Sequence, residues 1–177
     1  MNKEKGLIHI YCGDGKGKTT AALGLALRAA GAGKRVHFIQ LLKGNPTSEL
    51  QGLTFISNIT VDRPEKNFGF TFNMTEEQKA ELTGIHNRLL NSAFEKMNCG
   101  GMDMLIIDEF FAAYNKELLD RRLAERIVFE KSSACELVMT GREPEKKFID
   151  IADYVSDIKC VKHPYEQGVT ARKGIEY

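Results

Sequence analysis

The sequence predicts a three-layer α/β sandwich with a mainly parallel sheet, formed as one domain over residues 1–177. Short apolar runs alternate with longer helical patterns along the chain, which is the order of βαβ units. Several of these runs are apolar on both faces, as the strands of a covered parallel sheet must be. The chain contains no internal repeat, low-complexity tract or Pro/Gly-rich linker, so we expect no second domain.

The expected elements follow one another at regular intervals. The strands are expected at 7–11, 35–42, 102–108, 136–140 and 154–161, and the helices at 18–31, 75–97, 117–131 and 145–153. The first helix is rich in Ala and Leu and is followed by the stop signals Gly31 and Gly33. The second helix begins at a capping box formed by Thr75 and Gln78.

The stretch 43–74 shows no regular pattern and contains Pro46, Pro64 and several glycines. Loops of this length inside a compact domain tend to be lids or substrate loops. We therefore expect this stretch to be irregular and to serve the site.

The composition is that of an ordinary globular protein, with 42% hydrophobic and 28% charged residues. A net charge of +1 provides no basic field that would attract nucleic acid or an anionic membrane. The four cysteines form no C-x-x-C pair and no zinc spacing, which favours free thiols in a reducing cytosol. The apolar run "LIHIY" is too short for a signal peptide or a membrane span. These features predict a cytoplasmic protein.

The stretch "CGDGKGKTTAALG" at 12–24 is similar to a phosphate-binding loop. The pattern requires Gly, four free positions and then Gly-Lys-Ser/Thr. Gly17-Lys18-Thr19 supplies the end, but Cys12 stands where the first glycine belongs and Gly13 comes one place late. Glycine-rich backbone between a strand and a helix can point its N–H groups at phosphate, aided by the helix dipole. We predict a phosphate site in a P-loop NTPase (RecA-like) fold; a plain glycine turn is the alternative.

The loop and a later strand end together predict a site for ATP and a metal ion. The expected ATP contacts in the loop are Gly13, Asp14, Gly15, Lys16, Gly17, Lys18, Thr19 and Thr20. Lys18 can place a cation against phosphate oxygens, and Thr19 can place a hydroxyl on Mg²⁺. The run "MLIIDE" ends a buried strand in Asp108 and Glu109, where a Walker B carboxylate would lie. We predict Mg²⁺, with Mn²⁺ as an alternative, at Thr19, Asp108 and Glu109; exposed loop acids are the alternative reading.

At this point the chain resembles the P-loop type corrinoid adenosyltransferases over nearly its whole length. The resemblance runs through "GDGKGKTTAALGLALRAAGAGKRV", "FIQLLKG", "GFTF", "IIDEF", "VMTGR" and "VKHPYEQGVTARKGIEY". The first stretch alone would admit many ATPases, whereas its combination with "TGR" and the carboxyl-terminal motif is specific. The family also tolerates a residue other than glycine at the position of Cys12.

The resemblance implies that the chain moves the 5′-deoxyadenosyl group of ATP onto reduced cobalt and releases triphosphate, in adenosylcobalamin biosynthesis or salvage. Co(I) is itself a strong nucleophile, so no grouping for acid–base work is needed, and none is seen in the sequence. The protein must align the 5′ carbon with cobalt and stabilise the departing triphosphate. Lys18 and Glu109 are the expected catalytic residues. The resemblance suggests that ATP lies reversed relative to ordinary P-loop enzymes.

Six further residues match family positions near the substrates: Arg28, Arg142, Phe70, Phe72, Lys162 and His163. The two arginines are expected to contact the nucleotide, since a guanidinium suits phosphate or base contacts. The two phenylalanines of "GFTF" are expected at the lower face of the corrinoid, and the Lys-His pair against the corrinoid or the triphosphate. Solvent-facing arginines, buried loop anchors and a solvated basic end are the alternatives.

The resemblance also implies partners, and the sequence departs from the family pattern at one place, its amino terminus. A flavoprotein reductant and a homodimer are expected, with no nucleic acid and no membrane as partner. Only six residues precede the first expected strand, whereas many family members have a longer segment that folds over the active site. A P-loop kinase or ATPase, and a nucleotide-binding regulator, are the competing functions; neither needs the carboxyl-terminal match.

Overall fold

A computed structural model of the chain describes residues 5–44, 47–69 and 71–176. Over these residues one sheet of six strands runs in the order β3-β2-β4-β5-β1-β6, and all paired strands are parallel. The strands are β1 (Ile8–Cys12), β2 (Val36–Gln40), β3 (Ile59–Asp62), β4 (Met104–Asp108), β5 (Glu136–Thr140) and β6 (Tyr154–Asp157). The parallel order confirms the α/β fold class.

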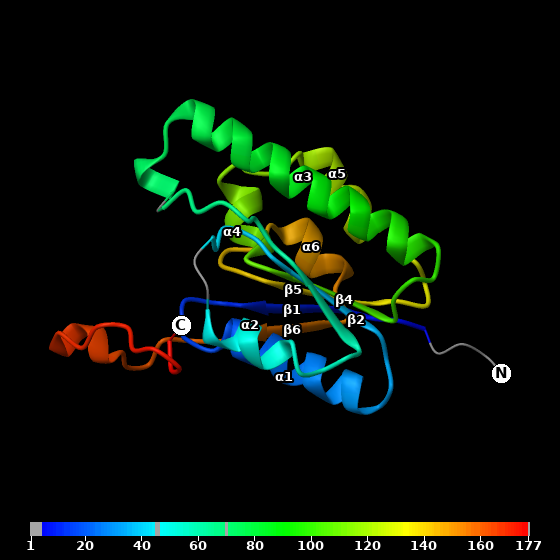
Figure 1. Cartoon of the computed structure of the whole chain (residues 1–177), viewed down its shortest axis with the longest axis horizontal. Helices are drawn as coiled ribbons and strands as arrows, with labels where there is room; N and C mark the ends of the chain where they lie inside the picture. Colours follow the sequence, from blue (N-terminus) through cyan, green and yellow to red (C-terminus); the bar gives the residue numbers. More distant parts are fainter. Residues whose placement is uncertain (1–4, 45–46, 70, 177) are drawn as a thin grey trace.

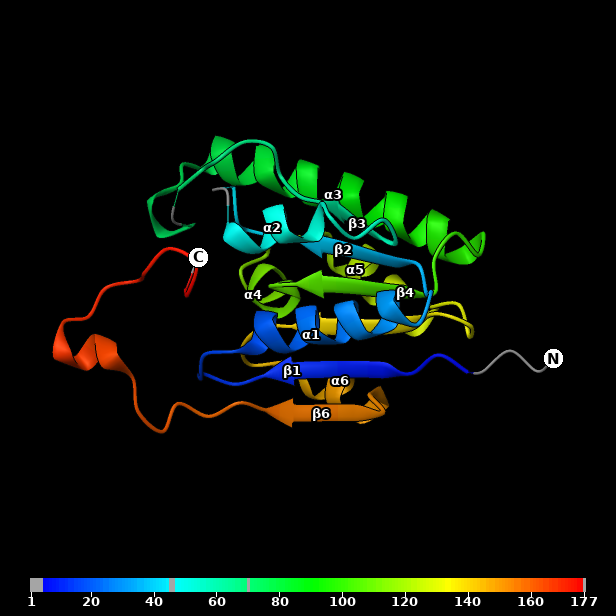
Figure 2. The same cartoon turned by 60° about the horizontal axis from the view of Figure 1, so that its bottom comes forward.

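Helices cover both faces of this sheet, which makes the three layers (Figure 1). On one face lie α1 (Lys18–Gly31) and α2 (Ser48–Leu53). On the other lie α3 (Glu76–Asn98), α4 (Phe110–Asn115), α5 (Arg121–Phe129) and α6 (Lys146–Ile151). Two short 3₁₀ helices, η1 (Thr71–Asn73) and η2 (Pro164–Gln167), belong to segments that extend past the carboxyl ends of the strands (Figure 2).

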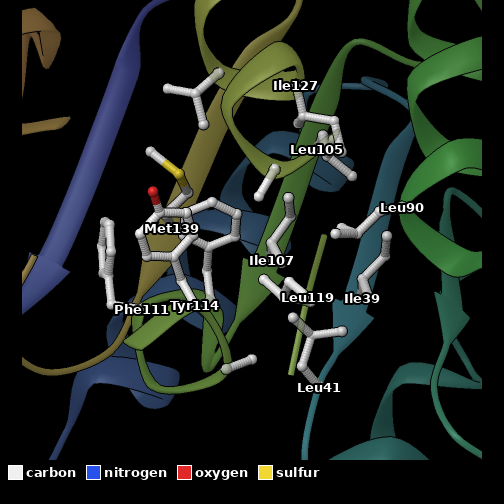
Figure 3. Packing of buried hydrophobic residues seen from close by; sticks show 14 of the residues in the cluster. Ile39, Leu41, Leu90, Leu105, Ile107, Phe111, Tyr114, Leu119, Ile127 and Met139 are labelled. Carbon is white, nitrogen blue, oxygen red and sulfur yellow. The ribbon is translucent and has the colours of Figure 1, made fainter. Parts of the chain in front are cut away.

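The two faces are packed differently. Against α3 to α6 the core is made of large side chains, and Figure 3 shows Ile39, Ile107 and Met139 from adjacent strands converging on Leu90 of α3 and Tyr114 of α4. Burial of this apolar area is the main favourable free energy of the fold. Against α1 the helix contributes small residues, namely Ala22, Ala26, Ala29 and Ala30. Small side chains let α1 lie close to the sheet, which brings its first turn near the strand ends.

Several expected elements are confirmed, and others are corrected. The first helix has the expected bounds, and the capping box at Thr75 and Gln78 is formed, with Thr75 as the N-cap of α3. The expected helix 117–131 begins only at α5, because the Asp120 side chain accepts a hydrogen bond from Leu123 N and starts a new helix there. Residues 110–115, which precede the expected helix, form the separate helix α4.

The stretch 43–74 is less irregular than expected, since it contains α2, β3 and η1. The missed strand is four residues long and lies at the sheet edge, where its side chains alternate only weakly in burial. The expected strands 35–42 and 154–161 are also shorter in the structure, at β2 and β6. Short edge strands carry little pattern because few of their side chains are buried on either face.

The fold brings three chain segments to one edge of the sheet. The carboxyl ends of β1, β4 and β5 lead into the loop at 13–17, into Glu109 and into Gly141, respectively. In open α/β sheets, ligands bind outside the carboxyl ends of the strands. This edge is therefore where the candidate site is expected. Within the described part of the chain, no helix is long and apolar enough to cross a membrane.

Candidate active site

The loop after β1 has the backbone of a phosphate-binding loop although Cys12 opens it. Cys12 is the last residue of β1 and is buried, with its Sγ donating to Ser156 O at 3.6 Å. The next residue, Gly13, takes a φ of +102°, and Gly17 takes +118° as the N-cap of α1. These left-handed angles favour glycine. The loop can therefore form although its first pattern position is Cys12, because the next residue, Gly13, supplies the left-handed turn.

Lys18 is held at the centre of the loop. Its Nζ donates to Gly13 O at 2.8 Å and to Gly15 O at 2.7 Å. Burial lowers the pKa of Lys18, and the positive charge of Arg142 lowers it further, while Glu109 opposes the shift. A half-buried cation at the first turn of a helix is suited to bind an anion of high charge.

Asp108 ends β4 in a fully buried position and is surrounded by donors. Its Oδ1 accepts hydrogen bonds from Thr19 Oγ1 at 2.9 Å and from Thr140 Oγ1 at 2.7 Å. Lys43 Nζ lies 3.3 Å from its Oδ2. The first turn of α1, two strand ends and the loop after β2 thus meet at one carboxylate.

Glu109 follows in a left-handed conformation, with φ 61° and ψ 24°, as the N-cap of α4. Its N–H donates to Thr140 Oγ1 at 2.9 Å. Burial raises the pKa of the Glu109 carboxyl, and the adjacent Asp108 raises it further. Two neighbouring carboxylates in a partly dry site would be stabilised by a divalent cation.

The donor set fits Mg²⁺. Thr19, Asp108 and Glu109 present oxygen atoms, the ligands that Mg²⁺ prefers, and Thr19 and Asp108 are already in contact. Among the residues that the structure describes, no group of three or more His, Cys, Asp or Glu side chains could hold a metal by itself.

Lys18, Thr19, Lys43 and Glu109 line a pocket of about 540 Å³ at the carboxyl edge, while Asp108 is fully buried and bonded to Thr19 of the lining. Its walls include 14–20, Lys43, Glu109, Arg142 and His163, and it is bordered by the tail residues 174–176. The structure therefore brings together the predicted loop contacts other than Gly13, one predicted arginine and one predicted tail residue.

Other predicted site residues lie elsewhere. Arg28 is exposed in the last turn of α1 and does not line the pocket. Lys162 is exposed and also lies outside the lining. Phe72 is 79% exposed in η1, and Phe70 lies outside the described residues. Figure 2 shows the segment with η1 and the carboxyl-terminal tail both extending beyond the edge where the pocket opens.

Four contributions were missed from the sequence. Lys43 and Thr140 hold Asp108, and each stands in a quoted motif, "FIQLLKG" and "VMTGR", that could have singled it out. Asn115 Nδ2 donates to Arg142 O at 3.3 Å and so fixes the loop that carries this arginine. Glu176 pairs with Lys16 of the phosphate loop at 2.9 Å. Glu176 also stands in a quoted motif, "VKHPYEQGVTARKGIEY", whereas Asn115 carries no local pattern.

A family profile described as "ATP:corrinoid adenosyltransferase BtuR/CobO/CobP" matches residues 4–177. The chain belongs to this family. The family match covers the phosphate loop, the acidic pair and the tail alike, so all three parts of the pocket lie within the shared region.

Individual members of the adenosyltransferase family agree along most of their length. The corrinoid adenosyltransferase of Escherichia coli (strain K12) is 31% identical over 175 residues, which are 98% of this chain and 87% of the relative. The corrinoid adenosyltransferase CobA of Salmonella typhimurium (strain LT2) is 32% identical over 178 residues, 99% of this chain and 87% of the relative. That of Sinorhizobium sp is 28% identical, covering 98% of this chain and 81% of the relative.

A solved structure of EssC (ATPases 2 and 3) from Geobacillus thermodenitrificans was also compared with the chain. The TM-score is 0.48 at 14% identity, over 97% of this chain and 36% of that chain.

Proposed function

We propose that the chain is an ATP:corrinoid adenosyltransferase of cobalamin metabolism, which transfers the 5′-deoxyadenosyl group of ATP to Co(I) and releases triphosphate. The observation that carries the proposal is one pocket that joins Lys18, Thr19, Glu109 and the tail, with the buried Asp108 bonded to Thr19, in a chain matched by the family over 4–177. A generic P-loop ATPase would not need the tail in this pocket.

In the proposed step an electron pair of Co(I) forms the cobalt–carbon bond at C5′, and the C5′–oxygen bond breaks with its pair leaving on triphosphate. No proton is transferred in this step, so it needs no general base. The task of the protein is to orient C5′ and to stabilise the leaving charge. Lys18 does this directly, because its contacts with the Gly13 and Gly15 carbonyls hold it in the loop before the substrate arrives.

Thr19, Asp108 and Glu109 would hold Mg²⁺ in this site. When bound, Mg²⁺ neutralises part of the charge of the triphosphate and so makes it a better leaving group. Arg142 contributes a second cation to the pocket, and Asn115 bonds its backbone carbonyl.

The remaining parts of the proposal concern orientation and partners. ATP is proposed to bind with its ribose toward the corrinoid, and Phe70 and Phe72 to pack under the corrin ring. His163 is proposed to meet a substrate, which is supported by its place in the pocket wall. A flavoprotein reductant, a homodimer and a cytoplasmic location are proposed from the family resemblance.

Product identity tests the proposed reaction. The full chain is incubated anaerobically with Mg²⁺·ATP and a chemically reduced corrinoid, and the products are separated. We expect triphosphate and a light-sensitive cobalt–carbon product. Lys18→Ala should lower the rate by roughly one to two decades, since a charge-assisted contact in a partly dry site contributes about 1.5–3 kcal/mol.

Two outcomes would contradict the proposal. Formation of ADP and phosphate would identify a kinase or ATPase instead. Binding of ATP without turnover in the presence of Co(I) would identify a nucleotide-binding regulator. Lys34→Ala, which changes a lysine at the opposite edge of the sheet, is the control and should keep the wild-type rate.

A further inference from the structure

Two buried polar side chains beside the pocket lack a hydrogen-bond partner. Among the residues that the structure describes, the buried side-chain nitrogen and oxygen atoms without such a partner belong to His37, Gln40 and Thr47. The His37 atom, Nε2, still lies 3.2 Å from an Asp62 carboxylate oxygen. Gln40 is 0% exposed, and neither end of its carboxamide is satisfied. Thr47 directly precedes the pocket-lining Ser48. Such groups are rare in folded proteins, so their place beside the pocket requires an explanation.

Gln40 lies in the same row of side chains as the Walker B aspartate. It is the last residue of β2, and the parallel register places it beside Asp108 of β4. Adjacent strands lie about 4.8 Å apart, and register partners point to the same face of the sheet. That face is the one covered by α1, because Phe38 packs in the core under α1 and Asp108 bonds Thr19 of α1. The carboxamide is therefore directed toward the Thr19–Asp108 corner of the site.

The other acceptors at this corner already have donors. Asp108 Oδ1 accepts from the hydroxyls of Thr19 and Thr140, and its Oδ2 is paired with Lys43. Gln40 Oε1, by contrast, is a buried acceptor in the same row that the described protein atoms do not use. Among the described residues, this corner thus contains a buried hydrogen-bond acceptor, Gln40 Oε1, that the fold itself does not use.

We propose that Gln40 is a positioning residue for the hydrated Mg²⁺ of bound Mg²⁺·ATP, with its carboxamide oxygen accepting a hydrogen bond from a metal-bound water. The inference rests on nucleotide binding in the proposed function. Mg²⁺ keeps several waters when it binds carboxylates and phosphates, and surrounding oxygen atoms orient such ligands. A carboxamide suits this position because it accepts a hydrogen bond without adding a third negative charge beside Asp108 and Glu109.

Gln40→Met tests the proposal, because Met fills a similar volume without polar atoms. The Kd for ATP is measured by calorimetry on the full chain across a Mg²⁺ titration and again in EDTA. The Mg²⁺ concentration for half-maximal tightening should rise about tenfold, while Kd in EDTA stays within about twofold. The thermal midpoint of the ligand-free protein should stay unchanged or rise, since an unsatisfied buried amide has been removed. Gln51→Met, on the exposed side of α2, is the matched control.

An unchanged Mg²⁺ requirement in Gln40→Met, or an equal loss of affinity with and without Mg²⁺, overturns the proposal and makes Gln40 a packing residue. Gln40→Glu keeps an acceptor oxygen at the same reach and covers the case in which the Met variant misfolds. It should keep or lower the Mg²⁺ requirement, and a rise as large as that expected for Met would also overturn the proposal. Neither measurement uses a corrinoid, so a negative result leaves the proposed transfer reaction untouched.

Discussion

Gly13 and Gly17 both carry left-handed backbone in the phosphate loop, but only Gly13 is also tightly enclosed. A Cβ on Gly13 would lie 2.4 Å from Ile158 O and 2.5 Å from Asp157 Oδ1, whereas one on Gly17 would meet nothing within 4 Å. Gly15 N donates to the same Ile158 carbonyl at 2.8 Å. The shape of the loop therefore depends on the chain that follows β6 as well as on its own turn.

Gly13→Ala should destabilise the protein and weaken ATP binding together, because it adds both a clash and a strained φ. A strained residue of this kind costs about 1–3 kcal/mol. Thermal unfolding and the Kd for ATP are the measurements. Gly24→Ala is the matched control, since Gly24 lies inside α1 and a Cβ there would meet nothing within 4 Å. The control should raise stability by about 0.5–1 kcal/mol. Equal effects of the two variants would show that the enclosure of Gly13 is unimportant.

Glu109 shows how a functional carboxylate works against stability. Burial raises its pKa above the value of 4.5 for an exposed glutamate, and the charge of Asp108 adds to the shift. The folded chain therefore holds this proton more tightly than the unfolded chain does. Ionisation as the pH rises through this range reduces the free energy of unfolding.

Glu109→Gln should raise the thermal midpoint of the ligand-free protein at pH 7, because the cost of ionising the buried carboxyl is removed. It should also raise the Mg²⁺ concentration needed for turnover, because one oxygen ligand has lost its charge. Below pH 4 the stability difference should vanish. A lower thermal midpoint with an unchanged Mg²⁺ requirement would make Glu109 a structural residue.

At the scale of elements, the sequence predicts best where a local pattern and a local cap agree. Both conditions hold for α3, with its capping box, and for α1, which begins in the glycine loop. They fail for 110–129, because α4 ends at Asn115, the backbone of Glu117 is left-handed, and Asp120 starts α5 as a new N-cap. They fail again in β3, a four-residue edge strand.

The segment with η1 gives a prediction that separates an adenosyltransferase from a generic ATPase. Phe72 is 79% exposed there, and Lys116 Nζ donates to the adjacent Thr71 hydroxyl. Large rings beneath a corrin can displace the lower axial ligand and exclude water, which makes Co(II) easier to reduce. Phe72→Ala should therefore slow an assay that starts from Co(II) with a flavoprotein reductant by roughly tenfold or more.

The same variant should have a much smaller effect when Co(I) is supplied ready-made, because attack on C5′ needs no further reduction. Equal losses in both assays would assign Phe72 to folding or docking, and no loss in either would place it outside the active site. Phe55→Ala, which removes another exposed ring just after α2, is the control.

At the scale of the whole molecule, the tail returns to the beginning of the chain. Glu176 Oε1 lies 2.9 Å from Lys16 Nζ, and its carboxylate also accepts from the backbone N–H and the guanidinium of Arg172. These two cations lower the pKa of Glu176. A tail carboxylate thus lies on a loop lysine at the border of the pocket that we assign to triphosphate.

Glu176→Gln should tighten ATP binding modestly, because Lys16 no longer has a competing anion. The change should stay within about fivefold, since exposed ion pairs contribute little free energy. It should also shrink at high salt. The Kd for ATP is measured at two ionic strengths, with Glu166→Gln in η2 as the control. Weaker ATP binding in Glu176→Gln would mean that the tail helps to hold the nucleotide.

Prediction from sequence fails at this scale for a physical reason. The loop, Asp108 and Glu109 are predictable because each follows a strand whose pattern is local, and parallel strands place their ends together. The Lys16–Glu176 pair joins residues 160 positions apart, and no periodicity encodes it. Likewise Arg28 matches a family position, yet α1 carries it to the end of the helix remote from the loop.

The pairing of Lys16 with Glu176 makes the tail a natural reporter of pocket occupancy. Arg172 and Lys173 are exposed, and trypsin cleaves the peptide bonds that follow such residues. While Glu176 is docked on the loop, the segment around them is held at its carboxyl-terminal end. Once triphosphate binds Lys16, the Lys16–Glu176 contact is lost, and tryptic cleavage of the tail should accelerate. A timed digestion read by mass spectrometry could then follow nucleotide binding without label, corrinoid or turnover.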